Sequence, residues 1–179
     1  MKKEVIISGF GGQGVMSIGK NLVEAAVAED LEAAWVPSYG PEMRGGTANC
    51  TVIVSDGRIG APLVERPSEV IVMNRAALAK FEPATAPGGI VFVNSSIVSE
   101  KVQRTDVRAI YVPCDEIAAE LGNTKVANMV MLGAYVAATG ALKQATIETM
   151  IQEMFTGPKA KLVPLNIEAF HRGMACVAE

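Results

Sequence analysis

Residues 4–29 read EVIISGFGGQGVMSIGKNLVEAAVAE, and this stretch predicts a strand, a glycine turn and a helix in direct succession. The short apolar run Val5-Ile6-Ile7 is typical of a buried strand. After the turn, apolar residues recur at the spacing of one helical face, at Val15, Ile18, Leu22, Val23 and Ala26. We therefore expect a sheet that is built outward from this first strand.

The glycine turn carries a recognisable pattern. Gly9, Gly11 and Gly14 match G-x-G-x-x-G where the strand gives way to the helix. In that context the first glycine permits a tight turn, the second a close approach of the backbone, and the third close packing of helix on strand. Because the first N–H groups of a helix have no intrahelical partner, they favour an anion above the turn. The turn therefore predicts either an anion site or three glycines needed only for packing.

The rest of the sequence alternates between strand-like and helix-like segments. Runs of apolar and β-branched residues predict strands at 32–37, 48–55, 70–73, 90–93 and 109–112. Apolar periodicity predicts helices at 75–81, 116–121, 125–139, 144–155 and 165–177. The turn signal Asp56-Gly57 indicates a chain reversal after the third strand. We expect an α/β fold with a mixed, mostly parallel sheet, helices on both faces and a helical C-terminal third.

The bulk composition fits a single domain over residues 1–179. Half of the residues are hydrophobic and the net charge is −3, so nothing electrostatic favours nucleic acid or an anionic membrane as a partner. The apolar run after Lys2 and Lys3 is too short for a signal peptide. The most apolar stretch, 129–142, falls short of the ~20 residues that cross a bilayer. A cytoplasmic protein is expected.

The three cysteines are far apart in the sequence. Cys50, Cys114 and Cys176 form no C-x-x-C pair, so they predict neither a zinc site nor an iron–sulfur cluster held by this chain alone. We interpret them as buried thiols in a reducing compartment and expect no metal site.

The glycine turn raises the alternative of an independent dinucleotide-dependent oxidoreductase. Such a fold usually places an acidic residue at the end of the second strand, where it binds the ribose hydroxyls. Here that strand ends Val36-Pro37-Ser38-Tyr39, and the acidic residues Asp30 and Glu32 precede it. The sequence also lacks G-x-x-x-x-G-K-[ST], which argues against a P-loop nucleotidase.

A second glycine-rich stretch follows the second predicted strand, from Tyr39 to Gly46. A loop at the carboxyl end of a strand lies on the side of an α/β sheet where ligands bind. Arg44 could therefore reach the same crevice as the Gly12 to Gly14 amides and bind a phosphate or carboxylate there. The alternative is that Arg44 is solvated or pairs with Glu42.

Residues for independent catalysis are few, and we expect none in this chain. His171 is the only histidine and falls in the last predicted helix, where a solvated or capping role is expected. Ser8, Ser17 and Cys50 have no base that the sequence places beside them. Asn128 starts an apolar helix and is interpreted as a helix-start or interface hydrogen-bonding residue. The methionines at core-like helical spacing are interpreted as packing residues: Met129, Met131, Met150 and Met154.

Several motifs, taken together and in order, resemble the gamma subunit of the 2-oxoacid:ferredoxin oxidoreductases. They are the turn 9–15, the loop SYGPEMRGG at 38–46, Cys50, Ile53 with Ser55-Asp56, Ile59, Pro62, and Asn128 followed by Leu132-Gly133-Ala134. The resemblance runs through most of the chain. The turn alone is unspecific, whereas its combination with YGPEMRGG and NMVMLGA is specific.

This resemblance implies a Rossmann-like three-layer fold and a subunit rather than a free-standing enzyme. The family's complex converts a 2-oxoacid and coenzyme A into acyl-CoA, CO₂ and reduced ferredoxin. Its thiamine diphosphate and Mg²⁺ belong to the alpha and beta subunits, and its iron–sulfur clusters to beta or a delta subunit. The compact YGPEMRGG form resembles 2-oxoglutarate or branched-chain 2-oxoacid enzymes more than pyruvate enzymes. The resemblance assigns possible coenzyme A contacts to Gly11, Gly12, Gln13, Gly14, Tyr39 and Arg44.

Three function classes follow. A gamma subunit predicts no turnover without alpha and beta partners, and possible self-association when isolated. A dinucleotide-dependent oxidoreductase predicts saturable NAD(P) or flavin binding by the isolated chain. The beta chain of indolepyruvate oxidoreductase shares the opening glycine motif, but the YGPEMRGG loop argues against it.

Overall fold

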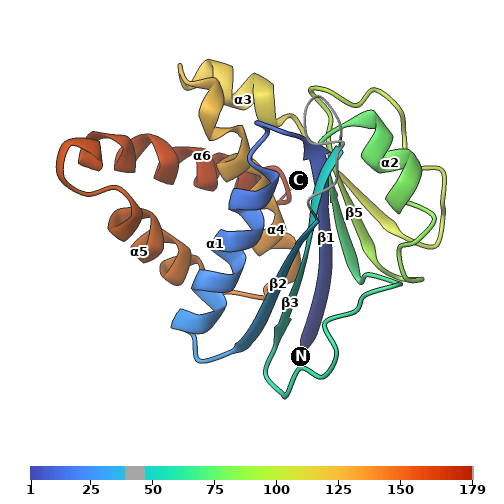
Figure 1. The fold of residues 1–179 in the computed structure, drawn as a ribbon. Helices are drawn as coiled ribbons and strands as arrows, with labels where there is room; N and C mark the ends of the chain where they lie inside the picture. Colours follow the sequence, from blue (N-terminus) through green and yellow to red (C-terminus); the bar gives the residue numbers. More distant parts are fainter. Residues whose placement is uncertain (39–46, 179) are drawn as a thin grey trace.

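The computed structural model describes residues 1–38 and 47–178. Its centre is a six-stranded sheet with the strand order β2-β3-β1-β4-β5-β6 (Figure 1). The strands are β1 (Lys2–Phe10), β2 (Glu32–Ser38), β3 (Thr47–Ser55), β4 (Glu69–Val72), β5 (Ile90–Asn94) and β6 (Arg108–Val112). Each lies where the sequence pattern predicts a strand.

The predicted helices are also confirmed, with small shifts at their ends. They are α1 (Val15–Ala28), α2 (Arg75–Phe81), α3 (Cys114–Glu120), α4 (Ala127–Thr139), α5 (Gln144–Met154) and α6 (Val163–Ala175). Two short 3₁₀ helices, η2 (Thr124–Val126) and η3 (Gly157–Leu162), lead into α4 and α6. The last four helices form the expected helical C-terminal third.

The sheet is mixed and mostly parallel, as expected. Strands β1, β4, β5 and β6 run parallel, while β3 is antiparallel to β1 and to the edge strand β2. The β1–β3 pairing extends from Lys2 opposite Ser55 to Phe10 opposite Thr47, which explains why β1 is longer than its apolar run. Because β3 lies between β1 and β2, the end of β2 is not adjacent to the glycine turn on β1.

Helices cover both faces of the sheet. α1 and α4 pack on one face with α3, α5 and α6 beside them, and α2 packs on the other face (Figure 1). The larger hydrophobic core includes four fully buried residues, Ile7, Ile18, Phe92 and Tyr135. The smaller core, on the α2 face, brings Ile6 together with Leu78 and Phe81 of α2. This three-layer arrangement gives the parallel strands β1, β4 and β5 two buried faces, which accounts for their continuous apolar runs.

Helices α4 and α6 cross at two glycines. A Cβ atom added to Gly133 would overlap the carbonyl oxygen of Phe170, and one added to Gly173 would overlap that of Val130. The two backbones are therefore in direct contact. This crossing holds α6 against the central helix α4, since both glycines are required for the approach.

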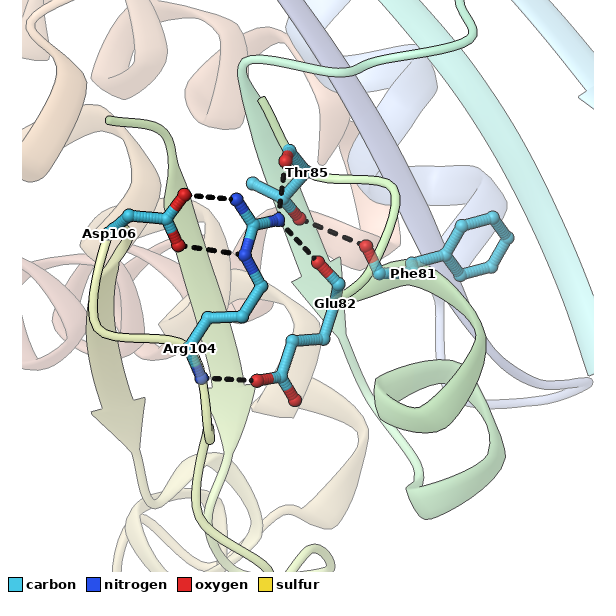
Figure 2. Close-up of polar contacts among 5 residues, drawn as sticks. All are labelled: Phe81, Glu82, Thr85, Arg104 and Asp106. Atoms are coloured by element: carbon cyan, nitrogen blue, oxygen red, sulfur yellow. Dashed lines mark hydrogen bonds and ion pairs between the residues drawn. The ribbon is translucent and has the colours of Figure 1, made fainter. Parts of the chain in front are cut away.

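An arginine fixes the long connection between β5 and β6 to the end of α2 (Figure 2). Arg104 donates through Nη1 to the carbonyls of Glu82 (3.0 Å) and Thr85 (2.6 Å). Its Nε and Nη2 atoms bind the two carboxylate oxygens of Asp106, which lowers the pKa of that carboxyl. The Glu82 carboxylate in turn accepts the N–H of Arg104 at 2.9 Å. The Arg104 side chain thus donates hydrogen bonds to main-chain carbonyls that have no partner at the end of the helix.

Glu69 is a buried carboxyl at the start of β4, and it predicts a pH dependence of stability. It is 2% exposed, and its carboxylate accepts from Ser68 Oγ (2.8 Å) and lies 3.4 Å from Lys3 Nζ. Burial nevertheless raises its pKa above the ordinary value of 4.5. The folded protein therefore holds this proton to a higher pH than the unfolded chain does. The stabilising contribution is complete below pH 4.5 and is lost as the pH rises through the folded-state pKa.

Glu69→Gln is accordingly expected to unfold at a higher denaturant concentration than the wild type at pH 7, because the neutral amide needs no desolvation of a charge. Chemical denaturation between pH 4 and 8 measures the effect. The exposed Glu65→Gln serves as the matched control and should leave the pH profile unchanged. Equal pH profiles for the wild type and Glu69→Gln would contradict the prediction.

Candidate functional site

The glycine turn borders a crevice at the carboxyl end of β1, next to β4. The cavity has a volume of about 410 Å³. It lies where the chain departs from β1 and β4 in different directions, which is the usual ligand side of an α/β sheet. Its lining combines the turn, the start of α1 and the segment before α4: Gly12, Gln13, Gly14, Ser17, Met73, Asp115, Thr124, Lys125, Ala127 and Asn128.

The turn adopts a conformation that favours glycine at two positions. Gly12 has φ +91° and Gly14 has φ +79°, both in the left-handed region. Gly14 is the N-cap of α1, and no side chain caps the helix there. The first hydrogen bond of the helix runs from the N–H of Ile18 to the carbonyl of Gly14. The N–H groups of the helical residues before Ile18 therefore have no partner within the helix and are available to a ligand.

The side chain of Gln13 clamps this turn to the neighbouring strand. Its Oε1 accepts the N–H of Phe10 at 2.7 Å, and its Nε2 donates to the carbonyl of Met73 at 2.9 Å. Both functional atoms of the amide are therefore engaged with main-chain groups. The Gln13 side chain therefore holds the turn in place, and the main-chain groups of the neighbouring residues are the ones that a ligand can contact.

Two of the glycines differ in role from the pattern's usual assignment. At Gly9, an added Cβ would lie 2.7 Å from the Met73 Cβ, so the first glycine provides the close packing between strands and helix. At Gly14, it would lie 2.7 Å from the Cβ of Asn128, so the third glycine makes room for α4 rather than for β1. The expectation that the third glycine packs helix on strand is therefore wrong for this chain.

The opposite wall of the crevice comes from η2 and α3. Asn123 Oδ1 accepts the N–H of Lys125 (3.0 Å), which starts η2 and brings Thr124 and Lys125 to the lining. Asp115 adds a carboxylate, which accepts a hydrogen bond from Asn94 Nδ2 at 2.7 Å. The positive charge of Lys125 and the open start of α1 favour an anionic ligand. The negative charge of Asp115 disfavours an anion directly beside it, which limits the positions that such a ligand can occupy.

The predicted site residues are only partly brought together. Gly12, Gln13 and Gly14 line the crevice, and Gly11 lines an adjoining hollow of about 350 Å³. Tyr39 and Arg44 lie outside the described residues. Sequence reasoning missed Ser17, Thr124, Lys125 and Asp115 as lining residues. The Gly-Asn-Thr-Lys turn ahead of an apolar helix is the signal that could have indicated the second and third of these.

Asn128 and Met154 differ from their sequence interpretations. Asn128 lies in the first turn of α4 as expected, but it makes no helix-start hydrogen bond within residues 1–38 and 47–178 and packs against Gly14. The alternative of an interface hydrogen bond stays a prediction. Met154 is 38% exposed and is not a core residue, whereas Met129 and Met131 are buried as expected.

The residues weighed as catalytic candidates do not form a catalytic group. His171 lies in α6, as expected, with Nε2 2.6 Å from Oε1 of Glu148 on α5, and it does not line the crevice. Burial raises the pKa of the Cys50 thiol to about 11 and that of Cys114 well above its ordinary value, so both thiols are unreactive. Cys50 and Cys114 are buried as expected, while Cys176 is only partly buried.

The described part of the chain shows neither a cluster of metal-binding side chains nor a membrane-spanning helix. It contains no group of three or more His, Cys, Asp or Glu side chains arranged to hold a metal ion. None of its helices combines the length and the apolar character that a membrane crossing requires.

Comparison with known proteins gives a family match over nearly the whole chain. The model of the family described as pyruvate ferredoxin/flavodoxin oxidoreductase matches residues 4–176. Among curated proteins, the 2-oxoglutarate synthase subunit KorC of Methanocaldococcus jannaschii is 36% identical over 183 residues, which cover 100% of this chain and 96% of that subunit.

A longer relative shows the same similarity over part of its length. The ketoisovalerate oxidoreductase subunit VorA of Methanothermobacter thermautotrophicus is 40% identical over 171 residues. These cover 94% of this chain but 35% of VorA, so the chain spans about a third of that relative.

A solved structure has the same fold. The gamma subunit of a keto/oxoacid ferredoxin oxidoreductase from Geobacter sulfurreducens PCA superposes with a TM-score of 0.84 at 30% identity. The superposition covers 98% of both chains. The sheet, its helical layers and the C-terminal helices described above are therefore shared with that subunit.

Proposed function

The chain belongs to the pyruvate ferredoxin/flavodoxin oxidoreductase family, and on that premise we propose that it is the gamma subunit of a 2-oxoacid:ferredoxin oxidoreductase. The observation that carries the proposal is the end-to-end similarity to subunits of such enzymes in Methanocaldococcus jannaschii and Geobacter sulfurreducens. The assembled enzyme would oxidatively decarboxylate a 2-oxoacid in the presence of coenzyme A, with ferredoxin as the electron acceptor.

In this complex the chain acts as a component without a catalytic group of its own. The crevice supports this role: among residues 1–38 and 47–178, its lining carboxylate Asp115 is held by Asn94, and no lining nucleophile has an adjacent base. Thiamine diphosphate and Mg²⁺ belong to alpha and beta partners, and the iron–sulfur clusters to beta or a delta subunit. The chain contributes subunit contacts and part of the coenzyme A path.

The substrate class we favour is 2-oxoglutarate or a branched-chain 2-oxoacid over pyruvate. The names of the relatives support it: one is a 2-oxoglutarate synthase subunit and another a ketoisovalerate oxidoreductase subunit. Rates of ferredoxin reduction by the assembled enzyme with 2-oxoglutarate, ketoisovalerate and pyruvate distinguish these substrates.

The crevice fits a phosphate group of coenzyme A. The uncapped start of α1 offers N–H donors, Lys125 offers a positive charge, and the bare backbone at Gly11, Gly12 and Gly14 allows close approach. When bound, coenzyme A supplies the thiol that takes the acyl group. We propose Tyr39 and Arg44 as further ligands from the family resemblance, and Gln13 as the residue that holds the turn in shape.

The first test is reconstitution of the complex. Co-expression with the alpha and beta subunits from the same source is expected to give a complex that reduces ferredoxin with a 2-oxoacid and coenzyme A, whereas the chain alone shows no turnover. Recovery of the chain alone from its native source, without a thiamine-dependent partner, would overturn the proposal.

A second test addresses coenzyme A binding in the reconstituted complex. Arg44→Ala and Lys125→Ala are each expected to raise the KM for coenzyme A about tenfold, because each removes a charge-assisted contact to phosphate. Arg58→Ala is the control, since Arg58 follows β3 at the opposite end of the sheet. An unchanged KM in either variant would remove that residue from the site.

The other two function classes are less well supported. Classical dinucleotide binding needs an acidic residue beside the glycine turn, and here β2 is an antiparallel edge strand separated from β1 by β3. Saturable binding of NAD(P) or flavin by the isolated chain would favour that class. Turnover of indolepyruvate by the reconstituted complex would favour an indolepyruvate oxidoreductase beta chain.

A further inference from the structure

Asp115 lies in the first turn of α3 and lines the crevice at the glycine turn. A carboxylate at the start of a helix commonly accepts the free N–H groups of that turn. Here Ser96 has that role, because its Oγ accepts the N–H groups of Asp115 and Glu116, both at 3.1 Å. The Asp115 side chain is therefore not needed to cap its own helix.

A buried asparagine fixes the Asp115 carboxylate from the side of the sheet. Asn94, at the carboxyl end of β5, is fully buried, and its Nδ2 donates to Oδ2 of Asp115 at 2.7 Å. The Oδ1 of Asn94 accepts the N–H of Ser96 at 3.3 Å, so both functional atoms of this amide are engaged. The other carboxylate oxygen of Asp115, Oδ1, makes no hydrogen bond within residues 1–38 and 47–178. One oxygen thus sets the position of the carboxylate, and the other remains as an acceptor.

The charges around the crevice have both signs, which restricts the ligand. Lys125 and the uncapped start of α1 favour an anion, whereas Asp115, the one acidic lining residue among those described, repels it. An ionised carboxylate only accepts hydrogen bonds, so the group beside Asp115 has to be a donor. A ligand that carries a phosphate with a hydroxyl group close to it meets both requirements.

Coenzyme A has this combination at two places. Its ribose carries a 2′-hydroxyl beside the 3′-phosphate, and its pantoate arm carries a hydroxyl close to the diphosphate. We propose that Asp115 accepts a hydrogen bond from a coenzyme A hydroxyl that lies beside a phosphate, and so selects which end of the molecule occupies the crevice. The inference rests on the proposed coenzyme A site.

Ligand analogues and one variant test this contact in the reconstituted complex. Calorimetric titration gives the Kd of coenzyme A, of 2′-deoxy-coenzyme A and of the analogue that lacks the pantoate hydroxyl, each for the wild type and for Asp115→Asn. The asparagine keeps an oxygen for Nδ2 of Asn94 and removes the charge. In the wild type, we expect the loss of one of the two hydroxyls to raise the Kd about tenfold, because it removes a charge-assisted hydrogen bond. In Asp115→Asn, the same loss should change the Kd by less than about twofold.

Comparing analogues within each variant separates hydrogen bonding from charge repulsion. Asp115→Asn also removes a negative charge near the phosphate, so its Kd for coenzyme A combines two opposing effects. The ratio of the Kd values without and with the hydroxyl isolates the contact. Glu116→Gln is the matched control, because its carboxylate lies in the same helical turn but lines a different hollow. It should keep the wild-type ratios.

The outcomes distinguish this proposal from the one on which it rests. The analogue with the raised Kd shows whether the ribose or the pantoate arm lies in the crevice. Equal ratios in the wild type and Asp115→Asn for both analogues, while Lys125→Ala still weakens coenzyme A binding, would overturn the role of Asp115 and leave the coenzyme A site standing. If neither Lys125→Ala nor Asp115→Asn changes the Kd or the ratios, both proposals fail.

Discussion

Gly133→Ala and Gly173→Ala are each expected to lower the free energy of unfolding by about 2–4 kcal/mol, the cost of forcing extra volume into a closely packed contact. The added methyl would meet the carbonyl of Phe170 in the first case and that of Val130 in the second. A backbone carbonyl cannot rotate away as a flexible side chain can, so α4 and α6 would have to separate. For a chain of 179 residues the melting temperature should fall by roughly 5–15 °C.

The sign of this effect distinguishes packing from helix propensity. Propensity alone predicts that alanine in a helix interior is more stable than glycine by about 1 kcal/mol. Denaturant unfolding monitored by circular dichroism measures the difference for both variants. Gly60→Ala is the control, because an added Cβ there has nothing within 4 Å and should change stability by less than about 0.5 kcal/mol. A stabilised Gly133→Ala would refute the close crossing.

The sequence predicted which segments form strands and helices because the relevant signals are local. Period-two and period-3.6 patterns mark each strand and helix within a few residues of its observed ends. Gly133 shows where local information stops. In the sequence it interrupts an apolar helix, and its partner, Phe170, is 37 residues away, so the crossing depends on tertiary packing that no local pattern encodes.

The order of the strands was likewise not predictable from local patterns. The turn at Asp56 indicated a reversal, but the insertion of β3 between β1 and β2 follows from pairing over nine residues with β1. That insertion moves the end of β2 away from the glycine turn. The sequence lacks an acidic residue at the end of β2 that could bind a ribose. The strand order agrees with this observation, because the end of β2 does not lie next to the glycine turn.

For the candidate site, the sequence identified the turn but not the opposite wall. The motif predicts Gln13 as a ligand because the residue lies inside it, whereas its side chain is engaged with the carbonyl of Met73 and the N–H of Phe10. Thr124 and Lys125 lie more than 100 residues after the turn that they face.

Gly14→Ala is expected to be the most damaging single change at the turn, at about 2–5 kcal/mol of unfolding free energy, because two costs combine. The left-handed backbone at φ +79° disfavours any residue with a Cβ by about 1–2 kcal/mol. The Cβ would also lie 2.7 Å from that of Asn128, which adds an overpacking cost of about 1–3 kcal/mol. Gly12→Ala isolates the first cost, since Gly12 has φ +91° but nothing within 4 Å of an added Cβ.

Asn128→Gly should rescue Gly14→Ala in part, because it removes the Cβ that collides. Asn128→Ala should rescue it far less, since its Cβ remains in place. Glycine in the first turn of α4 itself costs up to about 1 kcal/mol, so a double-mutant cycle is needed, and we expect a favourable coupling energy of at least about 1 kcal/mol. Denaturant unfolding of the single and double variants measures that coupling. Additive effects would mean that Gly14 is required only for its backbone conformation and that α4 does not press on the turn. A favourable coupling would instead link the start of α4, with its neighbour Lys125, directly to the shape of the glycine turn.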